Sequence, residues 1–337
     1  MGKENVLVER RATGLLIIEV RNSNPNGDPD RESDPRQRNH NGRGEITPVS
    51  FKRKVRDLIE WKDGLAWQEI KKKFTPELND EEFMILESRE RGFKDVKDAA
   101  EAWRKVLEIV DDETKMRNKY WDARVFGSTF LEKGEESPED SKDQAVGGQK
   151  DNKKKGKKKE DKKYIKTGIV QFGLGISVSP VLLDRCTLTK KASAEESKDR
   201  GMAPLGYRVV EHGVYYMPFF VNPLVAHKSG CRQKDIDVLL KTIPLAYKGT
   251  PSMPRNCIEI RHAWYMEHKS AWGSCSDFTL LDALTPKRKG DTDEQRKANT
   301  EKPSTSWDDY DVPTQLPSEL RNKLEEQNGF KDLMNEQ

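Results

Sequence analysis

The stretch of sequence that decides the fold begins at residue 15 and ends at residue 56. It opens with the apolar run LLIIEV (15–20), continues with the loop sequence NPNGDPD (24–30) and closes with TPVSFKRKVR (47–56). The apolar run predicts a buried strand, and the Pro- and Gly-containing loop cannot continue regular structure. A strand that leads through a polar loop to a basic helix is a common way to bind a polyanion, which makes nucleic acid the first partner to test.

The third segment predicts a helix over 48–61. Thr47 supplies a hydroxyl cap, and Pro48 gives up no hydrogen bond at the first helical position. The apolar positions at helical spacing are Phe51, Val55, Leu58 and Ile59, and the basic positions on the other face are Lys52, Arg53 and Arg56. Because the start of a helix also attracts phosphate, we expect an exposed basic face that contacts phosphates.

Composition limits the class of protein. The chain has 337 residues, of which 34% are hydrophobic and 35% charged, and its net charge is only +3. The whole-chain charge therefore does not argue for nucleic acid, and only its local distribution can. Four scattered cysteines without a C-x-x-C pair, an N-terminus without an apolar signal core and the lack of a long apolar run predict a reduced cytoplasmic protein with no membrane contact.

Apolar patterns predict the remaining strands and one more helix. The predicted strands are 168–180, 215–221 and 257–268, with a short strand or strand edge at 122–127 and an amphipathic helix at 235–245. In the strand 168–180 the apolar residues alternate with Gln171 and with small glycines and serines. We expect one core face there and one small polar face that another backbone can approach closely.

Between these elements lie insertions of distinct composition. Residues 62–121 predict a helical insert, residues 132–166 a mobile charged loop, residues 188–208 a polar arm and residues 286–337 a charged tail with one short helix near 320–328. The lysine-rich part of the charged loop either contacts phosphates or is simply solvated. The element order fits an α+β, ferredoxin-like split βαβ sheet.

Candidate contacts come from amides and cations near this sheet. Asn24 and Asn26 offer amide groups in a tight loop, and Arg255 flanks another strand. The aromatic RNA-recognition motif is absent, so we expect the backbone of the nucleic acid to be held with little regard to sequence. The aspartates at 28, 30 and 34 are interrupted by prolines and are better explained as turn residues than as a metal site. No pattern typical of a catalytic site, a metal site or a cofactor site is present.

Several blocks together resemble a known protein family. They are NPNGDPD (24–30), TPVSFKRKVRD (47–57), DARVFG (122–127), GIVQFG (168–173) and SMPRNCIEIRHAWYMEH (252–268). Their order and spacing resemble the CRISPR-associated Cas7 family of the RAMP superfamily, the backbone subunit of type I Cascade complexes, nearest its type I-C branch. The matched blocks span residues 14–285, whereas the tail 286–337 has no counterpart.

The resemblance implies a single RNA-binding domain over 1–285 with a modified RNA-recognition-type palm, helical fingers and a β-hairpin thumb. The palm would comprise 14–61, 122–131, 168–183 and 213–268, the fingers 62–121 and the thumb 184–212. The RNA contacts it implies are Lys52, Arg53, Arg56 and Gln171, with Arg208 and His212 after the thumb, and Met202 as the wedge beside a displaced base.

The resemblance also implies a function. Such a subunit is not an enzyme; it binds guide RNA (crRNA), forms a helical filament with neighbouring copies of itself and presents the guide for pairing with target DNA in prokaryotic antiviral defence. Its other partners would be the backbone-capping and large subunits of Cascade. Two alternatives stay open: a RAMP-superfamily endoribonuclease that cuts RNA with a loop aspartate, and a general single-strand-binding scaffold without a guide.

Overall fold

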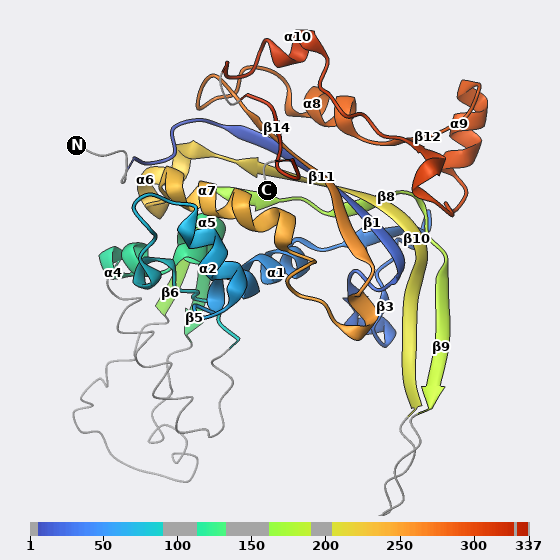
Figure 1. Ribbon diagram of the computed structural model, residues 1–337, viewed down its shortest axis with the longest axis horizontal. Helices are drawn as coiled ribbons and strands as arrows, with labels where there is room; N and C mark the ends of the chain where they lie inside the picture. Colours follow the sequence, from blue (N-terminus) through green and yellow to red (C-terminus); the bar gives the residue numbers. More distant parts are fainter. Residues whose placement is uncertain (1–5, 90–112, 133–161, 190–203, 327–328, 336–337) are drawn as a thin grey trace, which may run out of the picture.

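The computed structural model describes residues 6–89, 113–132, 162–189, 204–326 and 329–335. These residues form a mixed α/β fold around an eight-stranded sheet with helices on both faces (Figure 1). The main path through the sheet runs β14 (Lys331–Asp332), β11 (Ile258–Glu267), β1 (Ala12–Ser23), β10 (Pro204–Val221), β8 (Gly175–Pro180) and β4 (Arg43–Ile46), and β7 (Val170–Phe172) and β9 (Leu183–Thr189) also pair with β10. Every pair in this sheet is antiparallel.

The central strand β1 is buried on both faces, as its continuous apolar sequence predicts. Leu16 and Ile18 pack into one hydrophobic core, whereas Leu15 and Ile17 pack into a second core on the opposite face. Alternating side chains of a strand point to opposite faces of a sheet. The run of four apolar residues therefore requires cover on both sides.

Four helices cover the first face. They are α1 (Pro48–Glu60), α2 (Leu65–Lys72), α5 (Trp121–Phe126) and α7 (Gln233–Thr242). Phe51 and Val55 of α1, Trp67 of α2 and Leu239 of α7 belong to the same core. The predicted helices 48–61 and 235–245 are thus present with bounds close to those expected.

The other elements are short. The 3₁₀ helices are η2 (Pro29–Arg31), η3 (Asp80–Phe83), η5 (Pro223–Val225), η6 (Ile243–Leu245), η7 (Met253–Arg255) and η8 (Trp307–Asp309), and the remaining α-helices are α4 (Glu113–Lys119), α6 (Ala226–Ser229), α8 (Asp277–Leu284), α9 (Asp293–Thr300) and α10 (Ser318–Arg321). Three two-stranded sheets pair β2 (Gly27–Asp28) with β3 (Asp34–Pro35), β5 (Gly127–Glu132) with β6 (Lys162–Thr167), and β12 (Lys287–Arg288) with β13 (Tyr310–Asp311). No helix among the described residues is both long and apolar enough to span a bilayer.

Two strands, β7 and β8, replace the single strand predicted over 168–180. Phe219 of β10 pairs with Phe172, and Tyr216 pairs with Ile176, so β10 advances three residues while its partner advances four. One extra residue in a strand turns the side chains that follow to the opposite face. The prediction of one core face along the whole segment was therefore wrong.

The predicted small polar face is also absent from β8. Ser177 and Ser179 are buried, and Ser177 accepts a hydrogen bond from the backbone N–H of Gly44 at 2.8 Å. Val178 packs into the second core, on the face opposite to Phe172. Only Gln171, before the break, keeps an exposed side chain of the kind expected.

The segment 122–127 was predicted as a strand and is mostly helix. Trp121 and Val125 stand four residues apart and are both buried in the first core, and Gly127 ends the helix α5 with a φ of 87°. Periodicity cannot separate a strand from a helix in so short an apolar run. Most of the helical pattern predicted between 62 and 121 lies in 90–112, outside the described residues, as does most of the charged loop 132–166.

The second face of the sheet is covered by the segment that follows Pro286, together with α8. Leu280, Tyr310, Leu316 and Leu324 fill the second core, and β14 extends the sheet beside β11. This segment was predicted as a charged tail with one short helix, and it instead forms a layer over the sheet (Figure 1, red and orange).

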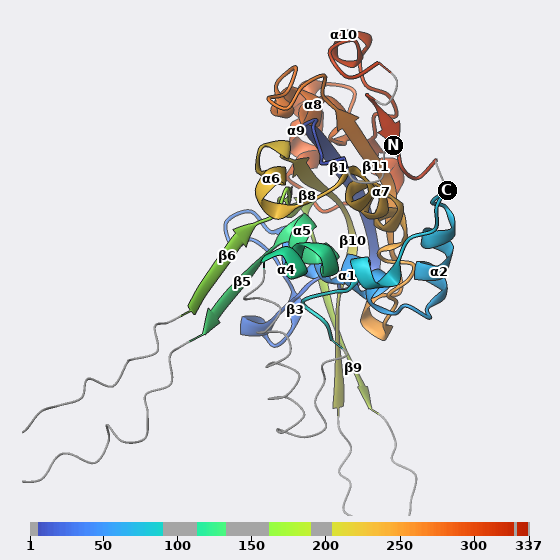
Figure 2. The same cartoon turned by 90° about the vertical axis from the view of Figure 1, so that its left-hand side faces the viewer.

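A long hairpin of β9 and β10 occupies the place of the predicted arm. The two strands pair from Leu183 opposite Val210 to Thr189 opposite Pro204. Figure 2 shows this hairpin and the β5–β6 hairpin projecting from the body in different directions. The tip of the arm, including Met202, lies outside the described residues.

Candidate nucleic-acid interface

A basic groove runs along α1 on the first face of the sheet. It has a volume of about 1600 Å³ and is bounded by α1, α2, the segment from Asp237 to Arg255 and parts of the loop that precedes α1. Its lining contains ten lysines and arginines but only four acidic residues. This local excess of positive charge contrasts with the net charge of +3 for the whole chain, and a groove lined by one sign of charge attracts ligands of the other.

The helix α1 is placed by its cap and by the loop before it. The Thr47 hydroxyl accepts a hydrogen bond from the Ser50 N–H at 3.3 Å. The Thr47 N–H and hydroxyl both donate to Oδ1 of Asn26 at 2.7 Å. Asn26 therefore lines the groove, as predicted, but its side-chain oxygen is already used to attach the loop to the helix.

Asn24 also supports the loop. It is buried, its Nδ2 donates to the Ser33 carbonyl at 2.9 Å, and its backbone N–H donates to the Pro254 carbonyl at 2.6 Å. The side chain of Asn24 is thus turned into the protein, and the groove lining does not include it.

Two of the predicted cations on α1 are neutralised inside the protein. Arg53 contacts Asp57 at 2.7 Å and Glu60 at 2.5 Å. Arg56 is only 4% exposed and contacts Asp122 at 3.0 Å. The prediction that all three basic residues share an exposed face was wrong for Arg56, because α5 and the chain near residue 87 cover that side of α1.

Lys52 lies outside the groove lining. Its ammonium is 5.2 Å from the centre of the Phe126 ring, and Arg56 is over the same ring at 5.2 Å. Burial, and then the neighbouring Arg56, lower the pKa of Lys52 below its usual value. Lys52 remains a predicted RNA contact, on the flank of α1 that faces α5.

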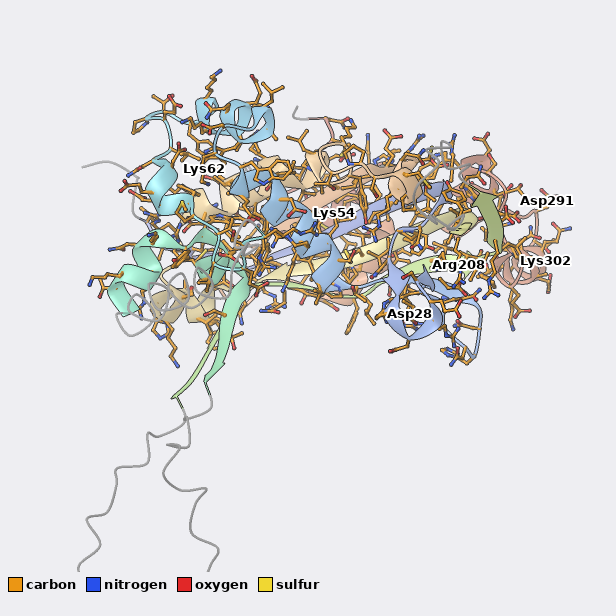
Figure 3. All side chains as sticks on the ribbon, turned by 90° about the horizontal axis from the view of Figure 1, so that it is seen from below. Asp28, Lys54, Lys62, Arg208, Asp291 and Lys302 are labelled. Atoms are coloured by element: carbon orange, nitrogen blue, oxygen red, sulfur yellow. The ribbon has the colours of Figure 1, made fainter. Side chains whose placement is uncertain are left out.

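None of the lysines in the groove lining was predicted as a contact, and the buried one on α1 is Lys54. Lys54 is 6% exposed, and its ammonium lies 3.3 Å from the Thr250 hydroxyl and 4.9 Å from the centre of the Tyr247 ring. Burial, followed by the charge of Arg255, lowers the pKa of Lys54 to about 8. In Figure 3 Lys54 lies near the middle of the face seen from below, between Lys62 and Arg208.

A sequence signal for Lys54 does exist. The buried positions of α1 include Phe51, Lys54, Val55, Leu58 and Ile59, which have the spacing of one helical face. A lysine at such a position either reaches solvent at the edge of the apolar face or is buried with it. In the structure Lys54 is buried.

Arg255 is the second cation of interest in the groove. It was predicted as an RNA contact, and it lies at the end of η7 in the lining. Its Nε is buried and has no hydrogen-bond partner among the described residues. The groove therefore brings together four of the predicted site residues, Asn26, Arg53, Arg56 and Arg255, and adds Lys54.

Three predicted contacts lie elsewhere. Gln171 donates to the Gly168 carbonyl at 3.1 Å on β7. Arg208 donates to the Glu32 carbonyl at 2.8 Å and contacts Asp34 at 3.2 Å, so it holds the loop before α1. His212 was expected near the surface and is 4% exposed, because Ser304 of the C-terminal layer approaches its Nδ1 to 2.7 Å.

The loop aspartates have partners within the protein. Asp28 accepts a hydrogen bond from the Asp30 N–H at 3.3 Å and so caps η2. Asp34 forms ion pairs with Arg185 and Arg208, one on each strand of the β9–β10 hairpin. Within the part of the chain that the structure describes, no group of three or more acidic, histidine or cysteine side chains is arranged to hold a metal ion.

Comparison with known proteins identifies related chains. A family model described as CRISPR-associated protein Cas7 matches residues 10–315. A solved CRISPR RNA-guided surveillance complex shares 14% identity over 86% of this chain and 80% of that one, with a TM-score of 0.40.

Two further solved structures are similar at the same low level. A pre-nicking CRISPR RNA-guided surveillance complex shares 16% identity over 86% of this chain and 84% of that one, with a TM-score of 0.43. A type III-B Cmr-beta complex bound to cognate target RNA shares 11% identity over 75% of this chain and 60% of that one, with a TM-score of 0.36. No curated protein sequence matches the chain.

Proposed function

The chain belongs to the CRISPR-associated Cas7 family, and we propose that it is the backbone subunit of a type I Cascade complex, of the type I-C branch, that binds guide RNA along the basic groove. The observation that carries this proposal is the excess of cations that line the groove beside α1. Contacts to phosphates supply most of the affinity of such sites and carry no sequence information. A subunit of this kind holds guides of any sequence.

The family architecture maps onto the elements as follows. The palm would be β1, α1, β7 with β8, β10, α7 and β11, whose order along the chain is strand, helix, strand, strand, helix, strand. That order is the one of a ferredoxin-like unit, which supports the assignment. The fingers would be residues 62–121, and the thumb would be the β9–β10 hairpin with its tip.

Oligomerisation and target pairing belong to the same proposal. Different elements cover the two faces of the sheet. One surface of a copy would therefore contact a different surface of the next copy. Contacts of this heterologous kind that do not close generate filaments. Guide bases that face away from the groove would pair with target DNA, and capping and large Cascade subunits would complete the complex.

The test is purification of the protein with its natural partners from its native host, followed by sequencing of the RNA that co-purifies. We expect one class of small RNA that shares a repeat-derived segment and varies elsewhere. Heterogeneous RNA without a shared segment would support a general single-strand-binding scaffold instead. Recovery of the protein without RNA would contradict both readings.

A non-catalytic role is also part of the proposal. A type III-like nuclease would use one loop aspartate, for which Asp28, Asp30 and Asp34 are the candidates. The ion pairs of Asp34 with Arg185 and Arg208 favour a structural role for that residue. The purified complex, incubated with Mg²⁺ and RNA complementary to the guide, should leave that RNA intact. Cleavage that is lost in Asp34→Ala, with the complex still assembled, would replace this proposal by a nuclease.

A further inference from the structure

Lys54 is a buried charge that forms no ion pair with a carboxylate of the described residues. Its ammonium contacts the hydroxyl of Thr250 and the face of the Tyr247 ring, and no carboxylate of the described residues lies within ion-pair distance. A buried ammonium without a charged partner is costly, and native proteins usually pair such groups. The arrangement is therefore incomplete as it stands.

Arg255 increases this imbalance. No ion pair joins its guanidinium to a carboxylate of the described residues, and its Nε is buried without an acceptor. The positive charge of Arg255 lowers the pKa of Lys54, so it disfavours the ammonium form of that lysine. Two cations that repel each other in one groove are stable together when an anion lies between them.

The neighbouring cations of α1 show the contrast. Arg53 has Asp57 and Glu60 as partners, and Arg56 has Asp122. These arginines are satisfied without a ligand. Lys54 and Arg255 differ from them because no carboxylate of the described residues forms an ion pair with either.

We propose that Lys54 and Arg255 form a phosphate-binding subsite of the groove, in which one phosphodiester of a bound single-stranded RNA accepts hydrogen bonds from both side chains. This inference rests on the proposed function for the source of the phosphate. It moves the main charged contact of α1 from Arg53 and Arg56, which have carboxylate partners, to Lys54, which has none among the described residues. A phosphate has enough acceptor oxygens for an ammonium and a guanidinium at once.

The charges around Lys54 give this subsite a pH dependence. The pKa of Lys54 is lowered to about 8, first by burial and then by Arg255, while Asp57 acts to raise it and Arg89 to lower it. Asp57 is already paired with Arg53 at 2.7 Å. Because the phosphate needs the charged ammonium, the affinity for RNA should fall as the pH rises through about 8.

The first experiment measures binding of the full-length protein to two fluorescent single-stranded RNA oligonucleotides of unrelated sequence. We expect Lys54→Met and Arg255→Gln each to weaken binding about tenfold for both RNAs, as loss of a charge-assisted hydrogen bond implies. The slope of log affinity against log salt should also decrease by about 0.7 per variant. The matched controls, Lys302→Met and Arg321→Gln, change exposed residues outside the groove and should stay within about twofold of the parent.

The second experiment repeats the binding at pH 7 and pH 9. One pH unit above its pKa only about one tenth of a group remains charged, so the parent protein should lose about tenfold in affinity. Lys54→Met should lose much less over the same range. A variant that only contains less folded protein would bind more weakly at both pH values and would keep the parent's ratio of affinities. Circular dichroism of each variant checks its fold.

The third experiment separates the possible sources of the phosphate. Thermal unfolding of the RNA-free protein is followed with and without inorganic phosphate at constant ionic strength, for the parent and for Lys54→Met. Stabilisation by phosphate that is lost in the variant, with unchanged RNA binding, would overturn the assignment to RNA. If Lys54→Met binds RNA as the parent does and phosphate stabilises neither protein, the proposed subsite does not exist. If the parent protein binds no RNA, the proposed function fails, while the phosphate measurement still tests the subsite.

Discussion

Single residues of α1 differ in how their charges are balanced, and one whose burial disfavours the charged form in the free protein is Lys54. Its pKa of about 8 in the folded chain lies below the value of about 10.4 in an unfolded chain. As the pH falls from about 10 to 8, the unfolded chain takes up a proton that the folded chain does not. Folding stability is therefore lost over this range and stays reduced below it.

Lys54→Met should accordingly stabilise the RNA-free protein at pH 7. We expect an increase of about 1–3 kcal/mol in the free energy of unfolding, because a buried charge is replaced by an apolar side chain of similar length. The gain should shrink towards pH 10, where Lys54 is neutral in the folded chain and begins to lose its proton in the unfolded chain. Urea unfolding at the two pH values, in buffers without phosphate, measures the difference. Equal or lower stability of the variant at pH 7 would show that Lys54 already has an anionic partner.

Asp122 is the buried carboxylate that compensates the charge of Arg56. It accepts from Arg56 Nε at 3.0 Å and from the backbone N–H groups of Leu86 at 2.7 Å and Glu87 at 3.1 Å. Asp122→Ala would remove the buried partner of this guanidinium and leave only Glu87, whose side chain is largely exposed. We expect a loss of about 3–5 kcal/mol in the free energy of unfolding.

The control for this prediction is Asp291→Ala, an exposed aspartate far from α1 (Figure 3), which should change stability by less than about 0.5 kcal/mol. Denaturant unfolding of both variants gives the comparison. A small effect of Asp122→Ala would mean that Arg56 reaches solvent or another acceptor. Because Arg56 is part of this buried ion pair, an Arg56 variant with weak RNA binding must first be checked for correct folding.

Sequence alone predicted that α1 is a basic helix but not which of its cations are available. The burial of Arg56 depends on Asp122, which lies 66 residues away in the chain. The availability of Arg255 depends on which carboxylates the fold brings near it. Spacing along one helix contains neither piece of information, although the position of Lys54 among apolar residues was a readable signal.

At the level of elements, the two strands of the β9–β10 hairpin share one carboxylate partner near the base of the hairpin. Arg185 and Arg208 are opposite each other in the register, and both contact Asp34, whose side chain is 7% exposed. The loop before α1 and the hairpin are thereby coupled. A hairpin that projects from the body (Figure 2) depends on such contacts for its direction.

Asp34→Asn should loosen this base. We expect a loss of only about 1 kcal/mol in global stability, since Arg185 is largely exposed and such ion pairs contribute little. Amide hydrogen exchange near Leu183–Arg185 and Arg208–Val210 should become faster, because local opening no longer breaks the ion pairs. Asp30→Asn, a change of the same kind at an exposed position of the same loop, is the matched control. Unchanged exchange in Asp34→Asn would show that the strand pairing alone holds the hairpin.

Elements with long, regular patterns were predicted well. The strand LLIIEV, the strand 257–268 and the helix 48–61 lie within a few residues of β1, β11 and α1. The break between β7 and β8 was missed, because one extra residue is visible only against the partner strand β10. The helix at 122–127 was missed because six residues do not define a period.

At the scale of the whole molecule, two different layers cover the two faces of the sheet. The helices α1 and α7 of the first face were predicted from periodic sequence, whereas the C-terminal layer reaches the second core through widely spaced residues such as Tyr310, Leu316 and Leu324. Its charged composition conceals these contacts, and for that reason it was predicted as a tail. The apolar run of β1, which needs cover on both faces, was the sequence feature that argued against a tail.

This asymmetry leads to a prediction about assembly on RNA. A molecule with different surfaces on its two sides can associate head to tail, and heterologous contacts that do not close continue until something limits them. If the groove holds a fixed length of RNA, the template sets that limit, because each copy adds beside the previous one and gains from the RNA they share. We expect the full-length protein mixed with synthetic single-stranded RNAs of increasing length to form complexes whose mass rises in equal steps.

Mass photometry and light scattering measure these steps at a fixed protein concentration. The double variant Lys54→Met with Arg255→Gln should need more protein to reach each step, while the RNA length per step stays the same, because the subsite determines affinity and the contacts between copies determine spacing. Lys302→Met with Arg321→Gln should behave as the parent. Complexes whose mass does not depend on RNA length, or long assemblies that form equally without RNA, would contradict a template-limited filament. A double variant that changes the step length instead would place Lys54 and Arg255 at the contact between copies and not at the phosphate.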